Sequence, residues 1–534
     1  MPQPRVATHA SHPNGNHVGI LRTTASDSRD DTNSPVPSNQ LQDLKVTISG
    51  AGPTGLLLAH LLLQKGAARV TLYESRPDPR LTAVTGSNPN NIQAAAAALA
   101  GFAYALGLGI RGRSAIQAVD QQLWHAVKQR GNECDRFRLQ AGPFNIKLRD
   151  SPRKRQKLLR NKVKSNGQEP LPEPSLLLFQ VDLCIALLNE LERRHGTDGG
   201  RLQLNFGSRI VDCDLEKRRI VVDSRNKNET IINSYDLLVG CDGVNSVVRN
   251  AMSQAAPTQF AADKKVLPGE FKVARLDTIP PKMDPNAVSL ILPKKGSTTL
   301  FLEPTVNGSC CILFAGRGGA DNPILSANST MENKTEILAE TLVESFPLLT
   351  GADLKDVAEQ LLTQKPGSAS SVTCNVYHYF SSAAIAGDAA HATGGVSGQG
   401  VNSALLDAVA LRDCLLEGYD PSNKQESLVR CLVRYSQRQV PEGKALYDLS
   451  FGPKPRGFKR ILYLLRGVRD TIFQGRLGIG KPPLQTMLTT SMVPFSSIRR
   501  RLDFYYDSPF PETEFFNNEI SLVYQTRNQP AGEK

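Results

Sequence analysis

The stretch GAGPTG, in which Gly50, Gly52 and Gly55 have the spacing GxGxxG, could bind a dinucleotide. It stands between a short apolar run, LKVTISG, and a helical pattern, PTGLLLAHLLLQKG, and Glu74 ends the apolar run that follows. Glycines in this order allow a tight turn and a close approach to a pyrophosphate, which meets the free N–H groups of the helix N-terminus. A carboxylate at the end of the second strand binds ribose hydroxyls and repels a 2′-phosphate. The pattern therefore predicts FAD or NAD rather than NADP in this pocket.

A second glycine-rich stretch, GDAAHATGGVSGQGVN at residues 387–402, follows the apolar run SSAAIAG and precedes an amphipathic helical pattern. Asp388 therefore comes at the carboxyl end of a strand, the edge where open α/β sheets bind ligands. There it could hold ribityl hydroxyls, and the helix N-terminus behind it would stabilise negative charge on a reduced flavin. A third apolar run ends in the turn Asp242-Gly243, which is unremarkable by itself because Asp-Gly turns are common.

The elements that must position these residues follow from the apolar periodicity. Residues 44–74 form a β–α–β unit, 91–109 are helix-prone, and 174–196 predict a strand, a turn and an amphipathic helix. Short strands are expected around 202–223, and a separate antiparallel sheet within 256–370. The predicted parts are a disordered tail (1–43), the first part of a dinucleotide-binding domain (44–255) with a charged loop insertion (147–175), a β-rich substrate domain (256–370), the rest of the binding domain (371–425) and a helical region (426–520).

The chain has 534 residues and a net charge of +12, which suits nucleic acid, an anionic membrane surface or an anionic ligand. A basic run at 152–164 lacks interleaved aromatic residues, so we expect a solvated insertion and no nucleic acid. The basic segment 455–476 has apolar residues at helical spacing; core packing is preferred there, and peripheral contact with a membrane is the alternative. No apolar run approaches the ~18 residues that span a bilayer.

Nine cysteines without a CxxC pair, in a chain of this size, predict reduced thiols and an intracellular protein, either cytoplasmic or mitochondrial. The histidines make no ligand-like spacing with these thiols, so no metal is expected. Residues 1–43 lack the apolar region of a secretory signal. Neither composition nor charge indicates the oligomeric state.

GAGPTG, DLLVGCDGVNSVVR and GDAAH…GQGVN, in this order, resemble the motifs of the single-component FAD-dependent aromatic hydroxylases. Within that family the sequence resembles most the kynurenine 3-monooxygenases, through YESRPDPR (73–80), ESFPLLTG (344–351), RQVPEGKALYDLS (438–450) and TMLTTSMVPFSSIRR (486–500). The resemblance implies an α/β fold, with a Rossmann-like FAD-binding domain interleaved with a β-sheet substrate domain, and a helical C-terminal region. The membrane-anchoring C-terminal helix of the kynurenine enzymes is not expected here, because the sequence ends in polar residues.

The resemblance also implies which residues bind FAD. The expected cofactor contacts are Gly50, Gly52, Pro53, Thr54, Gly55, Glu74, Ser75, Arg76, Gln180, Asp242, Gly243, Gly387, Asp388, Gly398, Gln399, Gly400, Val401 and Asn402. Among these, Gln180 would point at the flavin, where the kynurenine enzymes have Arg, and residues 398–401 would lie under the isoalloxazine. Asn402 and Gly395 are the expected substrate contacts. No catalytic residue is assigned, since the His391 position is structural in the family.

The sequence departs from the kynurenine enzymes in the loop after GDAAH. Gly395 stands where the family usually has Pro, and Val396 and Ser397 stand where the kynurenine enzymes have two Phe. The Arg with which those enzymes grip the substrate carboxylate has no counterpart in AIQAVDQQLWHAV, which offers Gln121 and Gln122. A buried carboxylate needs a charged, bidentate partner, so the resemblance leaves the substrate open.

The activity that the resemblance implies is a monooxygenase reaction. NAD(P)H, bound transiently because the sequence has no second dinucleotide fingerprint, would reduce FAD, and a flavin C(4a)-hydroperoxide formed with O2 would hydroxylate a kynurenine-like aromatic substrate. Two alternatives stay open: a terpenoid or lipid epoxidase of the same fold, and a flavin-binding protein that does not hydroxylate. A flavin halogenase is disfavoured because the chain has one Trp, and a disulfide reductase because it has no CxxC.

Overall fold

The computed structural model describes residues 40–81, 104–149, 173–196, 200–224, 229–319, 321–327, 334–472 and 484–525. Several expectations concern residues outside these ranges, namely the tail up to residue 39, the helix-prone residues 91–103, residues 150–172 of the insertion with its basic run, and residues 473–476 of the second basic segment. Leu41 and Leu44 are fully buried, so the packed structure already includes the last residues that we assigned to the tail.

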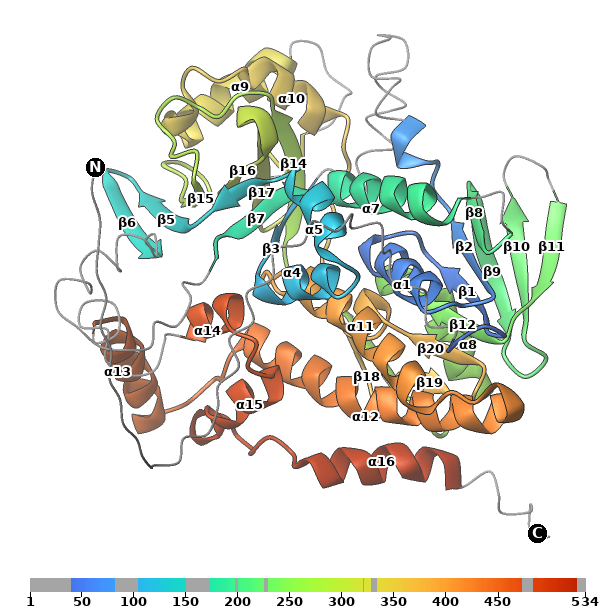
Figure 1. Cartoon of the computed structure of the whole chain (residues 1–534). Helices are drawn as coiled ribbons and strands as arrows, with labels where there is room; N and C mark the ends of the chain where they lie inside the picture. The colour runs from blue at the N-terminus through green and yellow to red at the C-terminus, as the bar shows by residue number, and fades with distance from the viewer. Residues whose placement is uncertain are drawn as a thin grey trace, which may run out of the picture. The chain divides into compact units, whose positions relative to one another are not determined.

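Six strands form the sheet that carries the first glycine motif, in the order β19-β20-β12-β1-β2-β8 (Figure 1). They are β1 (Lys45–Ser49), β2 (Arg69–Glu74), β8 (Leu202–Phe206), β12 (Leu237–Gly240), β19 (His378–Tyr379) and β20 (Ala383–Ile385). All neighbours are parallel except β19 with β20. α1 (Pro53–Gln64) connects β1 to β2, which confirms the β–α–β unit. The strand order reverses between β1 and β12, and a ligand site is expected at the carboxyl ends of these strands.

Helices pack around this sheet and make up most of the C-terminal part of the chain (Figure 1). α11 (Gly400–Gly418) is central, because it packs against α1, α4 and α12. The other helices are α4 (Ile110–Gln117), α5 (Gln121–Lys128), α7 (Gln180–His195), α8 (Val247–Ala255), α9 (Lys334–Ser345), α10 (Leu354–Leu362), α12 (Lys424–Phe451), α13 (Phe458–Ile472), α14 (Leu484–Thr490), α15 (Phe495–Arg500) and α16 (Thr513–Gln525). The predicted helical character after residue 426 is thereby confirmed for the residues that the structure describes.

A second six-stranded sheet has the order β14-β17-β16-β15-β5-β6. Its strands are β5 (Arg136–Ala141), β6 (Phe144–Arg149), β14 (Glu270–Leu276), β15 (Ala287–Ile291), β16 (Thr299–Pro304) and β17 (Cys310–Gly316). The expectation of a separate antiparallel sheet within 256–370 is wrong in two respects, since β5 and β6 come from earlier in the chain and β5 pairs in parallel with β15. Apolar alternation indicates a strand but not its partner, so this long-range pairing left no signal. α9 and α10 cover one face of the sheet.

A third, short antiparallel sheet has the order β3-β7-β4. Its strands are β3 (Ala105–Leu108), β4 (Asn132–Cys134) and β7 (Ser175–Phe179). The helix predicted over 91–109 is therefore wrong at its end, because pairing of β3 with β7 overrides the helix propensity of ALGL, which Gly107 weakens. β7 also continues into α7 at Gln180 without the expected turn. The remaining strands are β9 (Ser208–Asp214), β10 (Arg219–Ser224), β11 (Glu229–Ser234), β13 (Ala262–Val266) and β18 (Ser370–Cys374).

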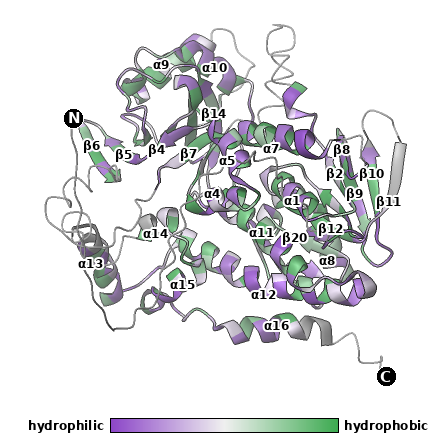
Figure 2. Ribbon diagram, in the orientation of Figure 1, coloured by the Kyte–Doolittle hydropathy of each residue, from purple (hydrophilic) through white to green (hydrophobic). Residues whose placement is uncertain are grey.

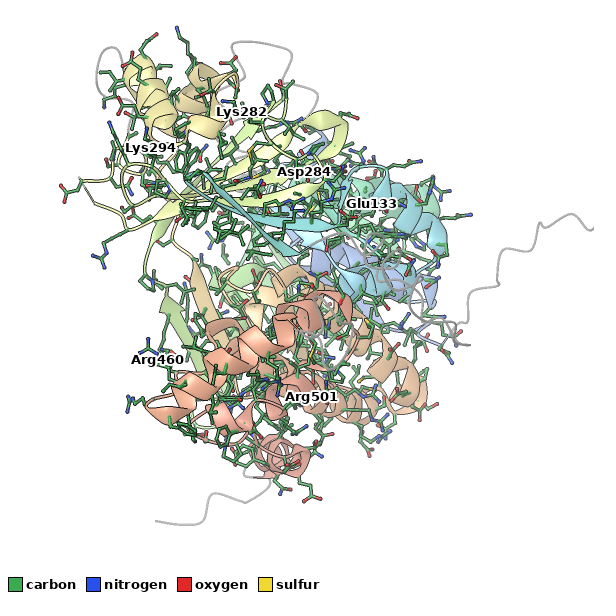
Figure 3. The ribbon with its side chains drawn as sticks, turned by 90° about the vertical axis from the view of Figure 1, so that its left-hand side faces the viewer. Glu133, Lys282, Asp284, Lys294, Arg460 and Arg501 are labelled. Atoms are coloured by element: carbon green, nitrogen blue, oxygen red, sulfur yellow. The ribbon has the colours of Figure 1, made fainter. Side chains whose placement is uncertain are left out.

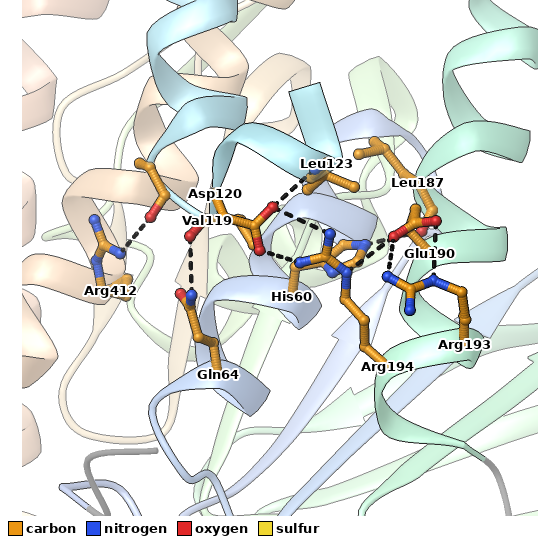
Figure 4. A network of polar contacts seen from close by, with 11 residues as sticks. His60, Gln64, Val119, Asp120, Leu123, Leu187, Glu190, Arg193, Arg194 and Arg412 are labelled. Atoms are coloured by element: carbon orange, nitrogen blue, oxygen red, sulfur yellow. Dashed lines mark hydrogen bonds and ion pairs between the residues drawn. The ribbon is translucent and has the colours of Figure 1, made fainter. Parts of the chain in front are cut away.

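A polar network ties α5 and α1 to α7 (Figure 4). Arg194 of α7 forms ion pairs with Glu190 and with Asp120, the residue that caps α5 through a 2.8 Å hydrogen bond from the Leu123 amide. His60 of α1 lies 2.8 Å from the carbonyl oxygen of Leu187, and burial lowers the pKa of His60 to about 3. This imidazole is therefore a neutral core group, and the network fixes the three helices that support the sheet.

α13 carries apolar side chains outside the core. Phe458, Ile461, Leu464 and Leu465 are each between 55% and 71% exposed, and Figure 2 shows apolar and polar residues alternating along the helix. The preferred prediction of core packing for the segment 455–476 is therefore wrong for these residues. Arg460 on the same helix points away from the ribbon in Figure 3. None of the helices in the described ranges combines the length and the apolar character that crossing a membrane requires.

Candidate functional site

The turn between β1 and α1 contains two glycines that packing requires and one that it does not. Gly50 has a φ of +99°, and a Cβ there would lie 2.4 Å from the carbonyl oxygen of Cys241. A Cβ on Gly55 would lie 2.1 Å from the carbonyl oxygen of Gly50. A Cβ on Gly52, in contrast, would meet no atom within 4 Å. Gly52 therefore leaves open space in front of α1, as a close approach by a pyrophosphate needs.

The N-terminus of α1 has no side-chain cap. Gly52 is the N-cap residue and supplies no side chain, and Pro53 at the first helical position has no N–H to be satisfied. The free N–H groups of the first turn, which includes Thr54, and the positive end of the helix dipole thus face the open space beside Gly52. This arrangement binds an anionic group without any positively charged side chain.

Glu74 is 6% exposed and holds the first glycine turn in place. Its carboxylate accepts hydrogen bonds from the Ala51 amide (3.0 Å), the Ser75 hydroxyl (3.2 Å), and the Arg76 amide and Nε (both 2.9 Å). Burial raises the pKa of Glu74, but the hydrogen bonds and charge of Arg76 outweigh burial, so the pKa lies below its usual value. Glu74 is therefore ionised at neutral pH, while its contact with a ribose stays a prediction.

The Asp242-Gly243 turn after β12 leaves a buried acceptor without a partner. Asp242 Oδ2 accepts hydrogen bonds from the Ser49 hydroxyl (3.1 Å) and the Val247 amide (2.9 Å), whereas Oδ1 has no partner in the part of the chain that the structure describes. Burial raises the pKa of Asp242 above its usual value, against the hydrogen bonds that its carboxylate accepts. Gly243 has a φ of +75° and open space at its Cβ position, so the turn is free on its ligand side.

A buried acid holds the second glycine-rich loop from behind. Asp407 of α11 accepts hydrogen bonds from the Gly387 amide (2.8 Å) and from His391 Nε2 (2.6 Å), and both its side chain and that of His391 are at most 2% exposed. A Cβ on Gly387 would lie 3.0 Å from Thr54 Oγ1, so the two glycine motifs are adjacent. Asp388, the next residue after Gly387, is exposed, yet burial raises its pKa. Its carboxyl is therefore partly desolvated by the protein around it and still open to a ligand.

The N-terminus of α11 resembles that of α1. Its N-cap residue, Gln399, makes no capping hydrogen bond, and Gly400 and Val401 form the first turn. Gly398 and Gly395 have φ values of +65° and +76°, and neither would meet an atom within 4 Å if it carried a Cβ. A second uncapped helix N-terminus with open space in front of it therefore lies next to Asp388.

Asn402 binds backbone groups of the protein instead of the substrate that we predicted for it. Its Oδ1 accepts hydrogen bonds from the amides of Gly109 (2.8 Å) and Gly112 (3.1 Å), and its Nδ2 donates to the carbonyl oxygens of Gly107 (2.9 Å) and Gly398 (3.4 Å). The side chain is 0% exposed. Asn402 thus joins α11 to the junction of β3 and α4, and this geometry leaves none of its polar atoms for a substrate. Sequence reasoning failed here because it could not show that these backbone groups lie within reach.

Gln180 begins α7 at the end of β7, and its Oε1 is buried without a partner among the described residues. Its backbone amide donates to the carbonyl oxygen of Tyr104, 3.2 Å away. Burial, and then the charge of Asp388, raise the pKa of Tyr104, so the phenol lies within electrostatic reach of that carboxylate. Gln180 and Asp388 are thereby linked through Tyr104, as expected if both face one ligand.

Three residues near this site were missed by the sequence reasoning. Tyr104 had no motif around it, and Arg111, 2% exposed at the start of α4, is one of many arginines in the chain. Glu303 had a weak signal, since it is the single acid in the apolar strand TLFLEP. An unpaired carboxylate in such a pattern is costly unless it has a partner or a function.

FAD fits the residues that are present. Two uncapped helix N-termini suit the anionic pyrophosphate and the electron-rich edge of a reduced flavin, and Gly52, Gly243 and Gly398 leave space for close approach. The orphaned oxygens of Asp242 and Gln180 are polar groups that a bound ligand would satisfy. Among the residues that the structure describes, no group of His, Cys, Asp and Glu could hold a metal ion, and none of the nine cysteines forms a disulfide.

Comparison with known proteins agrees with this fit. A family described as "FAD binding domain" matches residues 160–450, and one described as "NAD(P)-binding Rossmann-like domain" matches residues 48–105. A kynurenine 3-monooxygenase of Aspergillus candidus is 27% identical over 340 residues, which cover 60% of this chain and 65% of that protein, just under two thirds of its length. Another, from Stenotrophomonas maltophilia, is 26% identical over 477 residues, which cover 86% of this chain and 90% of that protein.

Solved structures show the same fold. 2-Methyl-3-hydroxypyridine-5-carboxylic acid oxygenase has a TM-score of 0.58 at 17% identity, covering 88% of this chain and 100% of that chain. PqsL of Pseudomonas aeruginosa, solved with 2-aminobenzoylacetate, has a TM-score of 0.52 at 16% identity, covering 76% and 95%. The chain belongs to the FAD binding domain family, that of the FAD-dependent aromatic monooxygenases, with FAD as cofactor and NAD(P)H as co-substrate.

Proposed function

We propose that the protein is a monooxygenase that uses NAD(P)H and O2 to hydroxylate an aromatic, kynurenine-like substrate. The observation that carries the proposal is the position of Asp388, which is exposed yet partly desolvated, next to the N-terminus of α11 and within electrostatic reach of Tyr104. Bound FAD supplies the chemistry: one oxygen atom of O2 enters the ring, and the other leaves as water with the electrons of NAD(P)H. The names of the relatives support a kynurenine-like substrate.

The chain's own residues would bind, orient and exclude water. The first turn of α1 would hold the pyrophosphate, Asp388 the ribityl chain, and the N-terminus of α11 would stabilise negative charge on the reduced ring. The second sheet would close the substrate side, because apolar groups such as Phe179 and Cys311 pack there. These assignments, the domain limits on which they rest and the route of oxygen transfer remain proposals.

Arg111 is the cation that a substrate carboxylate of this kind would need. It lies next to Gly109 and Gly112, which Asn402 binds, and therefore close to the loop that precedes α11. Its guanidinium donates to the carbonyl oxygens of Leu488 and Val493 (2.5 Å each), and no carboxylate forms an ion pair with it among the described residues. Burial lowers its pKa to about 10, so Arg111 still carries its charge at pH 7. The two carbonyl groups accept hydrogen bonds from only two of the five N–H donors of Arg111, which leaves the others for a ligand.

The proposal is tested by stopped-flow reduction of the bound flavin by NADPH and by NADH, with and without kynurenine. We expect kynurenine to speed reduction by at least about tenfold and a hydroxylated product to form, because hydroxylases of this kind gate reduction by substrate. Arg111→Gln should raise the kynurenine concentration needed for half-maximal effect at least about tenfold, the cost of an unpaired buried carboxylate. Purified protein that cannot be loaded with flavin would contradict the family assignment itself.

The same experiment separates the alternatives. If kynurenine has no effect but an apolar terpenoid or lipid speeds reduction, the protein is an epoxidase of this fold. If no compound speeds reduction and NAD(P)H is oxidised at one slow rate, the protein binds flavin without hydroxylating. Either result leaves the fold and the cofactor unchanged, because they depend on the glycine motifs rather than on the substrate.

Peripheral contact with a membrane is a separate proposal that rests on α13. Its exposed apolar residues lie among basic residues, including Lys459, Arg460 and Arg466, as in helices that lie on anionic lipid surfaces. Cosedimentation with phosphatidylserine vesicles at low and high salt tests it. Replacing both Leu464 and Leu465 by Ser should abolish binding, and equal sedimentation of this variant would rule out α13 as the contact.

A further inference from the structure

Glu303 lies on the face of the second sheet that is turned toward the cofactor side. Along β16, Leu300 and Leu302 point into the core beneath α9 and α10, so Phe301 and Glu303 point to the opposite face. Glu303 is paired across the ladder with Cys311 of β17, so the two side chains share that face.

The same face contacts the residues that lead to the cofactor loop. The Ala105 amide lies 3.4 Å from Cys311 Sγ, and Ala105, Phe179 and Cys311 form one small buried cluster. Ala105 directly follows Tyr104, whose pKa responds to the charge of Asp388. Phe179 directly precedes Gln180, whose Oε1 is an orphaned acceptor. Glu303 is thus connected through Cys311 and Ala105 to Tyr104, which lies within electrostatic reach of Asp388.

Glu303 has no partner for its charge. Among the described residues it forms no hydrogen bond and no ion pair, and it is only partly accessible to solvent. Burial, and no neighbouring charge, raises the pKa of Glu303 to about 7. Arg275 on β14, beyond Cys311 on the same face, does not neutralise it, because that guanidinium stacks on Phe179 with its carbon 5.1 Å from the ring centre and forms an ion pair with Asp277. A carboxyl in this state gains most from a donor that a ligand brings, and most of all from a cation.

We infer that Glu303 binds an amino group of the substrate, so that the aromatic substrate of this protein carries an ammonium nitrogen at the end remote from the cofactor. The inference rests on the proposed function and adds the substrate class to it. In a kynurenine-like compound the side-chain amino group would be this donor. Aromatic substrates without a nitrogen would leave Glu303 unsatisfied and would bind less well.

The test is a pair of aromatic probes of similar shape that differ in charge, tyramine and 4-ethylphenol, titrated by calorimetry into the flavin-loaded protein. In the wild type at pH 8 we expect tyramine to bind at least about tenfold more tightly, the size of one charge-assisted hydrogen bond. Glu303→Gln keeps the shape of the side chain and should reduce the ratio of the two affinities to near one. Glu344→Gln, which makes the same change at a carboxylate that is 62% exposed on α9, is the matched control and should keep the ratio.

Lowering the pH tests the same inference on the wild-type protein, without a variant. At pH 5.5 Glu303 would be protonated in the wild type, whereas the amine of tyramine stays charged, so the preference for tyramine should fall toward one. Equal affinity ratios in wild type and Glu303→Gln, or no binding of tyramine to the wild type, would overturn the inference. These affinities do not depend on turnover, so they stand apart from the stopped-flow result that decides the proposed function.

Discussion

The cofactor face and the substrate face of this protein differ in how many of their buried polar groups the chain itself satisfies. On the cofactor face, formed by the glycine turns before α1 and α11, Glu74, Asp407 and Asn402 are each bound by backbone groups of the chain itself. On the substrate face, formed by the side of β16 and β17 that carries Glu303 and Cys311, Glu303 has no partner among the described residues. The first face is held mainly by bonds within the chain and leaves single oxygens of Asp242 and Gln180 to a ligand, whereas the acid of the second face depends on a ligand for any partner.

The largest expected effect is on the cofactor face, at Gly55. Gly55→Ala would place a Cβ 2.1 Å from the carbonyl oxygen of Gly50, and backbone cannot yield there without moving β1 or α1. We expect destabilisation by more than about 3 kcal/mol and no flavin in the purified protein. Thermal unfolding followed by circular dichroism, together with the flavin absorbance at purification, measures both effects.

Gly52→Ala is the control that separates packing from binding. Its Cβ would meet no atom of the protein within 4 Å, so the midpoint of thermal unfolding of the flavin-free protein should match that of the wild type. Its affinity for FAD should nevertheless fall at least about tenfold, because the Cβ would occupy the space that the pyrophosphate needs. Unchanged FAD affinity in Gly52→Ala would show that the cofactor does not approach this turn.

The next effect concerns the buried pair of Asp407 and His391. Asp407→Asn would remove the charge that His391 faces at 2.6 Å, and breaking such a buried pair costs about 3 kcal/mol. Burial lowers the pKa of His391, but Asp407 outweighs burial, so the pKa lies above 6.5. The stability gained from the charged pair is therefore complete below about pH 6.5 and is lost as pH rises through the raised pKa. The free energy of unfolding of wild type and variant, measured by urea at several pH values, should converge on the alkaline side.

The cofactor face could be predicted from sequence because its determinants are local. Gly50, Gly52 and Gly55 stand within one turn, and their spacing encodes the turn, the ligand space and the packing of α1 on β1 together. The place of Asp388 in the fold could be predicted for the same reason, since it follows the short apolar strand β20 and lies in the one-turn helix Gly387–Ala389. Each of these assignments needed only neighbours in the chain.

The substrate face could not be predicted, because its residues meet through long-range pairing. Cys311 reaches Ala105 across 206 positions, and β15 takes β5 as its neighbour rather than another strand of its own segment. Asn402 was misread for the same reason, since its four backbone partners lie up to 295 positions away. Apolar alternation locates a strand and its faces, but not what the polar residue on one face will meet.

A smaller effect is expected at Asn402, and it tests whether this residue belongs to the scaffold. Asn402→Ala would leave the amides of Gly109 and Gly112 buried without an acceptor, at a cost of about 2 kcal/mol. Differential scanning calorimetry should show a lower unfolding midpoint, with the Michaelis constant for the aromatic substrate unchanged. A raised Michaelis constant at an unchanged midpoint would instead return Asn402 to the substrate side.

The smallest effect has the opposite sign, and it falls on the substrate face. Burial raises the pKa of Glu303 to about 7, whereas in the unfolded chain this carboxyl has a pKa of about 4.3. Between these two values Glu303 is protonated in the folded protein and ionised in the unfolded chain. Glu303 therefore destabilises the fold increasingly from about pH 4.3 to 7 and by a constant amount above that range. Glu303→Gln should leave stability unchanged near pH 4 and raise it by about 2 kcal/mol at pH 8, with allowance for partial exposure. Urea unfolding of the substrate-free protein at both pH values measures the difference. If the substitution destabilised the protein at pH 8, Glu303 would have a partner in the folded chain, and the contrast between the two faces would disappear.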